Sequence, residues 1–204
     1  SSLNIGLSYA SQQWFQAFEF NVVNENPFLP NFGQAREITF GMDVPAVYAG
    51  GFAYDAGSIL WTGDAKYITY SKTPGFDKQG FDQTGAVQGF GWEDIMVLAT
   101  GLQFSPSNSF ALRGGWNYSE NPIPDELSLF NIPAPAIVQH HATFGLGFQP
   151  FAGVNVDLAY YHVFENEISG PMFGPMGPIS GSSVSSKMYE DSFIMTFSFT
   201  PDGK

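Results

Sequence analysis

Four charged residues fall on matching faces of the strands that the sequence predicts. Arg113 alternates with apolar neighbours, and the same alternation places Asp64, Lys66 and Asp157 on the equivalent face of their own strands. A cation enclosed by a protein either pairs with an acid or binds an anion. Two interpretations follow for Arg113: a structural polar network with these residues, or a site that receives a carboxylate group. Lys72, at the start of a predicted loop, is a second candidate for the anion-binding role.

The histidines do not form a catalytic or metal-binding pattern. His140 and His141 are neighbours on one predicted strand, so their side chains point to opposite faces and cannot share a metal ion. No glycine-rich loop follows a strand and opens a helix, which is the context that nucleotide binding requires. The sequence therefore predicts no catalytic residues, no metal, no cofactor and no enzymatic activity.

A long loop near the C-terminus, residues 170–178, repeats glycine, proline and methionine. Met172, Phe173 and Met176 in this loop could contact an apolar ligand, because methionine suits adaptable apolar surfaces. The glycines and prolines could instead only stiffen the loop. Two other predicted loops contain similar apolar residues, namely Phe28, Leu29, Phe32, Phe76, Phe81 and Phe90.

The composition is unusual for a soluble domain. Aromatic residues make up 17% of the 204 residues and charged residues only 13%, against about 25% charged residues in typical globular domains. The longest apolar run, residues 95–99, is far too short for a transmembrane helix, which needs about 20 residues. A net charge of −12 with only seven Lys and Arg residues argues against nucleic acid as a partner.

Alternation of apolar with small or polar residues predicts eight antiparallel strands. Their expected ranges are 3–22, 36–54, 59–70, 92–104, 109–118, 135–149, 154–164 and 188–199. Large apolar side chains on one face and small or polar ones on the other are typical of strands that separate lipid from a polar lumen.

The expected connections alternate strictly between short and long. Residues 55–58, 105–108 and 150–153 form short turns, whereas residues 23–35, 71–91, 119–134 and 165–187 form long loops. Outer-membrane barrels have short periplasmic turns and long extracellular loops. The sequence therefore predicts an all-β fold, an antiparallel transmembrane β-barrel of the bacterial outer membrane, whose chain starts and ends on the periplasmic side.

Several segments resemble the late strands of FadL-type transporters, which take up long-chain fatty acids and other hydrophobic molecules. The hairpin of residues 92–118 resembles a family hairpin with an arginine in its second strand, here Arg113. The following Asn121-Pro-Ile-Pro124 and Asp125-Glu126 are similar to a proline-rich loop with acidic residues in that family. Further similar segments are residues 42–48, 65–71, 139–148 and 154–160.

The resemblance implies a barrel of fourteen strands with an N-terminal hatch, of which this single domain, residues 1–204, would supply the last eight strands. Lipid does not tolerate an open sheet edge, so the first and last strands must pair. We expect them to pair with a missing N-terminal half or another chain rather than with each other, because a closed eight-stranded barrel has room only for side chains.

Two functions follow from these expectations. The first is passive uptake of long-chain fatty acids or other hydrophobic small molecules across the outer membrane, with lipid and lipopolysaccharide around the barrel. The second is a structural β-barrel subunit of a larger outer-membrane complex that does not transport. A soluble β-rich binding domain is a third, weaker interpretation.

Overall fold

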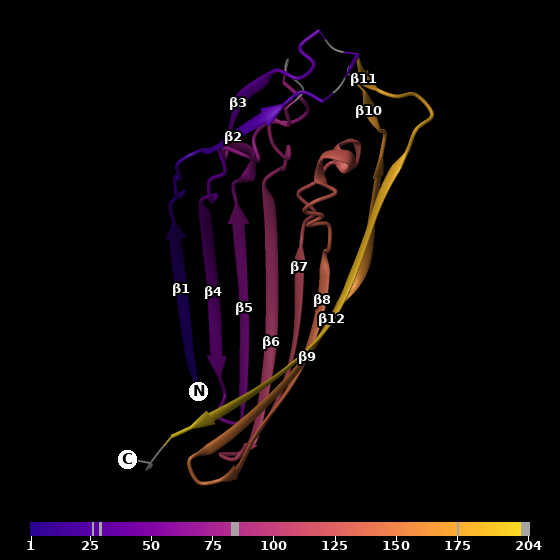
Figure 1. The fold of residues 1–204 in the computed structure, drawn as a ribbon. Helices are drawn as coiled ribbons and strands as arrows, with labels where there is room; N and C mark the ends of the chain where they lie inside the picture. The colour runs from indigo at the N-terminus through magenta and orange to yellow at the C-terminus, as the bar shows by residue number, and fades with distance from the viewer. Residues whose placement is uncertain (26, 29, 83–85, 175, 201–204) are drawn as a thin grey trace.

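The computed structural model describes residues 1–25, 27–28, 30–82, 86–174 and 176–200. Its main feature is one antiparallel sheet of eight strands (Figure 1). In sheet order the strands are β1 (Ser2–Ala10), β4 (Val47–Asp55), β5 (Ile59–Ile68), β6 (Ile95–Ser107), β7 (Phe110–Ser119), β8 (His140–Phe151), β9 (Val154–Gly170) and β12 (Val184–Phe199). The sheet is curved but open, with β1 and β12 at its two edges.

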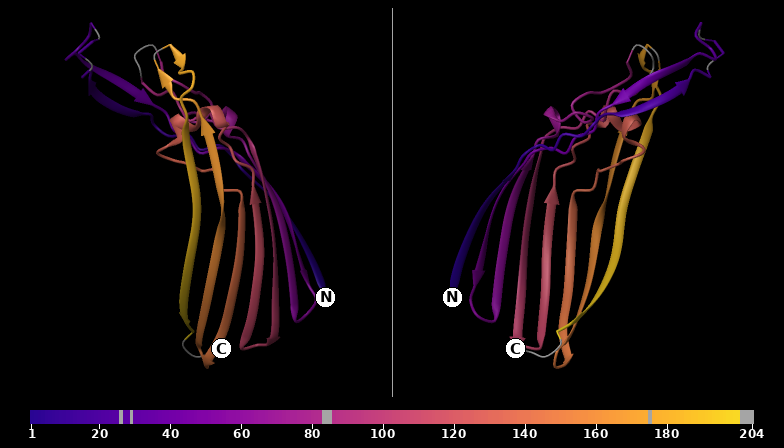
Figure 2. Two further views of the ribbon diagram at one scale, coloured as in Figure 1. Left: turned by 90° about the vertical axis from the view of Figure 1, so that its right-hand side faces the viewer. Right: turned by 60° about the vertical axis from the view of Figure 1, so that its left-hand side comes forward.

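The smaller elements lie at the loop end of the sheet. They are the hairpin β2 (Phe18–Val23) with β3 (Ala35–Phe40), the short 3₁₀ helices η1 (Tyr70–Lys72) and η2 (Asp125–Asn131), and the two-residue strands β10 (Phe173–Gly174) and β11 (Gly177–Pro178). Figure 2 shows that these elements gather at one end, while the tight turns, the N-terminus and the end of β12 lie toward the other. Among the described residues, no helix is long and apolar enough to cross a membrane.

The eight predicted wall strands are confirmed, but the first two are interrupted, and the sixth begins at His140 rather than at residue 135. Each of the predicted strands 3–22 and 36–54 forms two separate strands. The β1–β4 ladder ends at the Ala10–Val47 pair, next to the segment between β3 and β4 that contains Asp43. The buried Asp43 carboxylate accepts hydrogen bonds from the Phe15 backbone N–H (2.9 Å) and from Gln12 Nε2 (3.0 Å). Pro45, which has no N–H to donate, lies in the same interruption. Beyond it the chain pairs again as β2 and β3.

The last long loop is shorter than predicted, because β9 extends to Gly170 and β12 starts at Val184. The two strands pair along this whole length, with one bulge between Met188 and Glu190. The other long connections lie close to their predicted positions. The three short turns are also present, but β6 runs to Ser107 and β8 to Phe151, so the second and third turns are shorter than predicted. In two of the turns a glycine takes a positive φ, Gly57 at 87° and Gly153 at 78°.

Candidate functional site

The two faces of the sheet differ in character. The register places large apolar side chains on one face of every wall strand, for example Leu3, Phe52, Trp61, Leu102, Leu112, Phe144, Leu158 and Met195. Many of these side chains are exposed, including Leu7 at 87% and Ile5 at 75%. Tyr9, Tyr48, Tyr67 and Tyr118 mark the end of this apolar face nearest the loops. An apolar band bordered by aromatic residues is what a lipid bilayer requires of a barrel wall.

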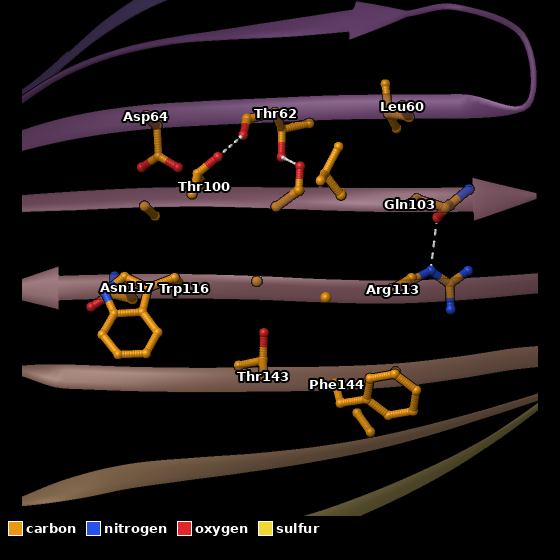
Figure 3. A pocket seen from close by; sticks show the side chains of 17 residues that line it. Leu60, Thr62, Asp64, Thr100, Gln103, Arg113, Trp116, Asn117, Thr143 and Phe144 are labelled. Carbon is orange, nitrogen blue, oxygen red and sulfur yellow. Dashed lines mark hydrogen bonds between the residues drawn. The ribbon is translucent and has the colours of Figure 1, made fainter.

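The opposite, polar face contains a shallow groove of about 470 Å³. Its floor is made of small residues from neighbouring strands, among them Gly101 on β6, Gly115 on β7 and Gly145 on β8. Arg113 and Gln103 lie at one end of the groove, and Asp64 and Asn117 lie at the other (Figure 3). The small floor residues give the groove its depth, because larger side chains would fill it.

Arg113 is held by two partners at the end of this groove. Its Nε donates to Gln103 Oε1 on the adjacent strand β6 at 2.7 Å. Its Nη1 donates to Asp157 Oδ1 on β9, also at 2.7 Å, and forms an ion pair with it. The two charged side chains remain 44% and 43% exposed, so water still reaches the pair. The structure thus brings Arg113 and Asp157 together.

Asp64 and Lys66 form a separate, looser pair on β5. Lys66 Nζ lies 3.8 Å from Asp64 Oδ1. Asp64 and Arg113 both line the groove, but among the described residues no ion pair joins the Lys66–Asp64 pair to the Arg113–Asp157 pair. Lys72 lies away from the groove, in the last turn of η1.

Asp94, which the sequence does not single out, anchors the loop around η1. Its carboxylate accepts hydrogen bonds from the Ser71 backbone N–H and from the Tyr67 hydroxyl, both at 2.8 Å. Burial alone would raise the pKa of Asp94, but these hydrogen bonds and the nearby charge of Lys72 outweigh it and lower the pKa below 3.8. The anchor is therefore ionised at neutral pH.

The long loops fold into a compact cap at the outer end of the sheet. Its core consists of Ile123, Leu127, Phe130, Ile137 and Ile168, with Trp92, Phe173 and Met188 packed against them. Four rings from residues 70–92, those of Tyr70, Phe76, Phe90 and Trp92, pack beside this core. The buried Asn131 links the two parts: its Oδ1 accepts from Trp92 Nε1 at 2.6 Å, and its Nδ2 donates to the Phe90 carbonyl at 3.0 Å.

The apolar loop residues therefore divide into two groups. Phe76 and Phe90 belong to the cap, and Phe81 and Phe173 each pack against Phe130, at centroid distances of 5.1 and 5.0 Å, although Phe81 remains 45% exposed. A second group is exposed: Phe18, Phe20, Phe28, Phe32, Met172 and Met176, of which Met176 is fully exposed. Leu29 lies outside the described residues. Of the three candidate residues in the loop 170–178, only Met172 and Met176 thus present an accessible apolar surface.

The three histidines lie apart. His140 is on the apolar face and packs against Trp116 and Tyr118, whereas His141 is on the polar face. His162 Nδ1 lies 2.8 Å from Asp191 Oδ1, on the apolar face of β9 and β12. Among the described residues, no group of three or more histidines and acids is close enough to hold a metal ion.

Two functional contacts were missed by reasoning from the sequence. Alternation places Gln103 on the same face as Arg113, and the tight turn between β6 and β7 sets the Gln103–Arg113 pairing, so this contact could have been predicted. The Trp92–Asn131 bond joins residues 39 positions apart in two loops. No local pattern predicts such a contact.

Comparisons with solved structures find the same fold in two toluene transporters and a FadL homologue. The chain matches the P. putida toluene transporter TodX with a TM-score of 0.60 and 14% identity, over 98% of this chain and 46% of TodX. It matches a Pseudomonas aeruginosa FadL homologue with a TM-score of 0.65 and 14% identity, over 96% and 48%. For the Ralstonia pickettii toluene transporter TbuX the values are 0.52, 14%, 97% and 44%.

The chain thus spans about half the length of these proteins. No family model matches the sequence, and no curated protein matches it. At this level of identity the likeness shows the fold alone. It confirms the predicted fold class: the open sheet has the fold of part of a FadL-type outer-membrane β-barrel wall. In that fold the apolar face meets lipid and the polar face lines the lumen.

Proposed function

We propose that this wall segment belongs to a passive conduit that carries hydrophobic small molecules across the outer membrane of a bacterium. The observation that carries this proposal is the groove on the polar face, which lies behind a lipid-facing apolar band in a fold shared with two toluene transporters. An apolar molecule cannot easily cross the polysaccharide layer of the outer membrane. A barrel with small lumen residues offers it a path that needs no energy source.

The exposed apolar loop residues suit the first contact with such a molecule. Phe18 and Phe20 share one face of the β2–β3 hairpin and are about half exposed, and Met176 is fully exposed on the β10–β11 side. Exposed apolar clusters on an otherwise polar surface mark sites for a ligand, a partner or lipid. We infer that they collect apolar molecules at the outer end of the barrel.

The two open edges of the sheet require partners within the membrane. Each unpaired backbone N–H or C=O group in hydrocarbon costs several kcal/mol. The matched transporters are about twice as long as this chain, so their remaining length is enough to close a barrel. We infer that β1 and β12 pair with further strands, from the same protein or another chain, and that lipid and lipopolysaccharide cover the apolar face.

The test is uptake by whole cells. A host that lacks its own uptake systems for hydrocarbons and fatty acids is given the full-length gene that contains these residues. Uptake of ¹⁴C-toluene and ¹⁴C-oleate is then measured over seconds to minutes. We expect faster entry of at least one of them. Rates equal to those of a host with the empty vector, in cells whose outer membrane contains the folded protein, would contradict transport.

The alternative is a structural subunit without transport, and the cap favours it. The 3₁₀ helix η2 and Ile137 pack against the upper part of β9 and β12, where Asn166 Nδ2 donates to the Ile137 carbonyl at 2.7 Å. This packing fills the outer end of the described wall segment with protein. A stable complex purified with the barrel, together with unchanged solute uptake, would support this alternative.

A further inference from the structure

The charges on the polar face are unequal. In the wall strands of the described residues, this face holds the acids Asp55, Asp64, Asp157 and Glu190 and the cations Lys66 and Arg113. With histidine counted as neutral, two positive and four negative charges give a formal sum of −2. The lumen side of this wall therefore repels anions.

Both cations are already engaged with acids. Arg113 holds Asp157 at 2.7 Å and also donates to Gln103, and Lys66 lies 3.8 Å from Asp64. The Glu190 carboxylate accepts a hydrogen bond from the Tyr161 hydroxyl, at 2.5 Å, rather than pairing with a cation. Consequently a carboxylate that enters the groove meets no unpaired cation on the described wall.

A carboxylate could bind Arg113 only by displacing Asp157 or by sharing the guanidinium with it. Both routes place two like charges within a few ångströms of each other, which disfavours the ionised form of one of them. An uncharged apolar molecule meets no such barrier. It only has to pass over the glycine floor formed by Gly101, Gly115 and Gly145.

We propose that the Arg113–Asp157 pair makes this passage selective for uncharged hydrophobic molecules, and that Asp157 is the residue that excludes carboxylates. This inference rests on the proposed transport function and narrows its substrate class from hydrophobic molecules in general to uncharged ones. In the absence of Asp157, Arg113 becomes an open anion-binding site at the end of the groove.

The experiment compares toluene with benzoate. The two compounds share a benzene ring, and toluene has a methyl group where benzoate has a carboxylate. The full-length protein is tested as wild type, Asp157→Asn and the double variant Arg113→Gln/Asp157→Asn. Asp77→Asn is the control: it removes one negative charge from an exposed loop residue outside the groove. Heat-modifiable mobility in gel electrophoresis verifies that each variant folds.

Wild type and Asp77→Asn are expected to take up toluene and largely exclude benzoate at pH 7. Asp157→Asn should raise benzoate uptake about tenfold with toluene uptake unchanged, because a charge-assisted hydrogen bond becomes available to the anion. The double variant should lose this gain. Equal entry of both compounds into wild type, or no change in folded Asp157→Asn, would overturn the inference.

A second measurement separates this inference from the proposed transport. Calorimetry in detergent measures benzoate binding to the purified variants. Binding by Asp157→Asn, but not by wild type or by the double variant, supports Asp157 as the group that blocks anions, even if no variant carries toluene into cells. In that case the proposed transport function is contradicted, whereas the role of Asp157 in blocking anions is still supported. Absence of benzoate binding by folded Asp157→Asn overturns the barrier itself.

Discussion

Arg113 on β7 reaches Asp157 on β9 across the whole width of the intervening strand β8. The guanidinium can do so because Gly147 lies beneath it: a Cβ at this position would come within 2.7 Å of Asp157 Oδ1 and 2.9 Å of Arg113 Nη1. A Cβ at Gly145, the next residue on the same face of β8, would also lie only 3.3 Å from Arg113 Cβ. The glycines of β8 therefore determine which residues can pair in the lumen.

Gly147→Ala should separate this pair at little cost in stability. The atoms in the way are the ends of flexible side chains, which can rotate aside, and an exposed ion pair contributes only about 0–1 kcal/mol. We expect the free energy of unfolding in lipid vesicles to fall by less than about 1 kcal/mol. Benzoate uptake should nevertheless rise, as for Asp157→Asn.

Gly6→Ala is the matched control for this variant, because a Cβ at Gly6 meets nothing within 4 Å. It should change neither stability nor benzoate uptake. A Gly147→Ala protein with wild-type selectivity would show that the pair forms without the space that the glycine provides.

Asn131→Ala should loosen the cap without unfolding the wall. The substitution leaves the Trp92 N–H and the Phe90 carbonyl without their partner, and an unsatisfied buried polar group costs about 1–3 kcal/mol. We expect hydrogen exchange to accelerate in residues 86–94 and 121–137, while exchange in β6 and β7 stays unchanged. Asn21→Ala, on the exposed hairpin strand β2, is the control. Uniform acceleration over all strands would contradict a local role for Asn131.

The loop around η1 should open in acid. The folded state lowers the pKa of Asp94, so its stabilising contribution is present above the ordinary value of 3.8 and is lost as the pH falls through the lower, folded-state pKa. Hydrogen exchange of residues 69–78, corrected for the intrinsic effect of pH, should therefore accelerate in wild type only below about pH 4. Asp94→Asn should show fast exchange at every pH. A wild-type loop that opens near pH 6 would point to a different titrating group.

Met176 and Phe173 should differ in what they contribute to uptake. Met176 is fully exposed, so Met176→Ser removes apolar surface without disturbing the loop. Phe173 packs against Phe130, so Phe173→Ser also removes a contact of the cap. We expect Met176→Ser to slow toluene uptake by about twofold to threefold with cap exchange unchanged, in line with the loss of about 0.5 kcal/mol of apolar contact.

Phe173→Ser should change both toluene uptake and hydrogen exchange in η2. Wild-type uptake by Met176→Ser would remove this loop from the proposed capture surface. Such a result would leave the exposed phenylalanines of residues 18–32, namely Phe18, Phe20, Phe28 and Phe32, as the remaining candidates of the exposed group.

The wall of the barrel could be predicted from the sequence because it depends on local alternation. Each strand repeats apolar and small residues with a period of two, and the turns contain residues that suit them, such as Gly57 and Gly153. The break between β1 and β2 could not be predicted in the same way. It depends on hydrogen bonds from Gln12 and Phe15 to Asp43, about 30 residues away.

The site could be predicted only in part. Alternation assigns Arg113 and Asp157 to one face, but their contact needs the register of three strands and a glycine between them. The exposure of the aromatic residues in the loops could not be predicted from the sequence. Phe90 and Phe28 look equivalent in the sequence, yet the Phe90 ring is partly buried against Phe76 and Trp92 while Phe28 is 93% exposed.

The exposed apolar face has a consequence for the life of the chain before it reaches a membrane. A folded wall with Leu7, Phe193 and Phe199 more than half exposed would aggregate in water, so water does not favour the native arrangement. The bilayer is the solvent in which this fold is stable. We therefore expect the polypeptide to cross any aqueous compartment in an unfolded form and to acquire this structure only as lipid covers the apolar face.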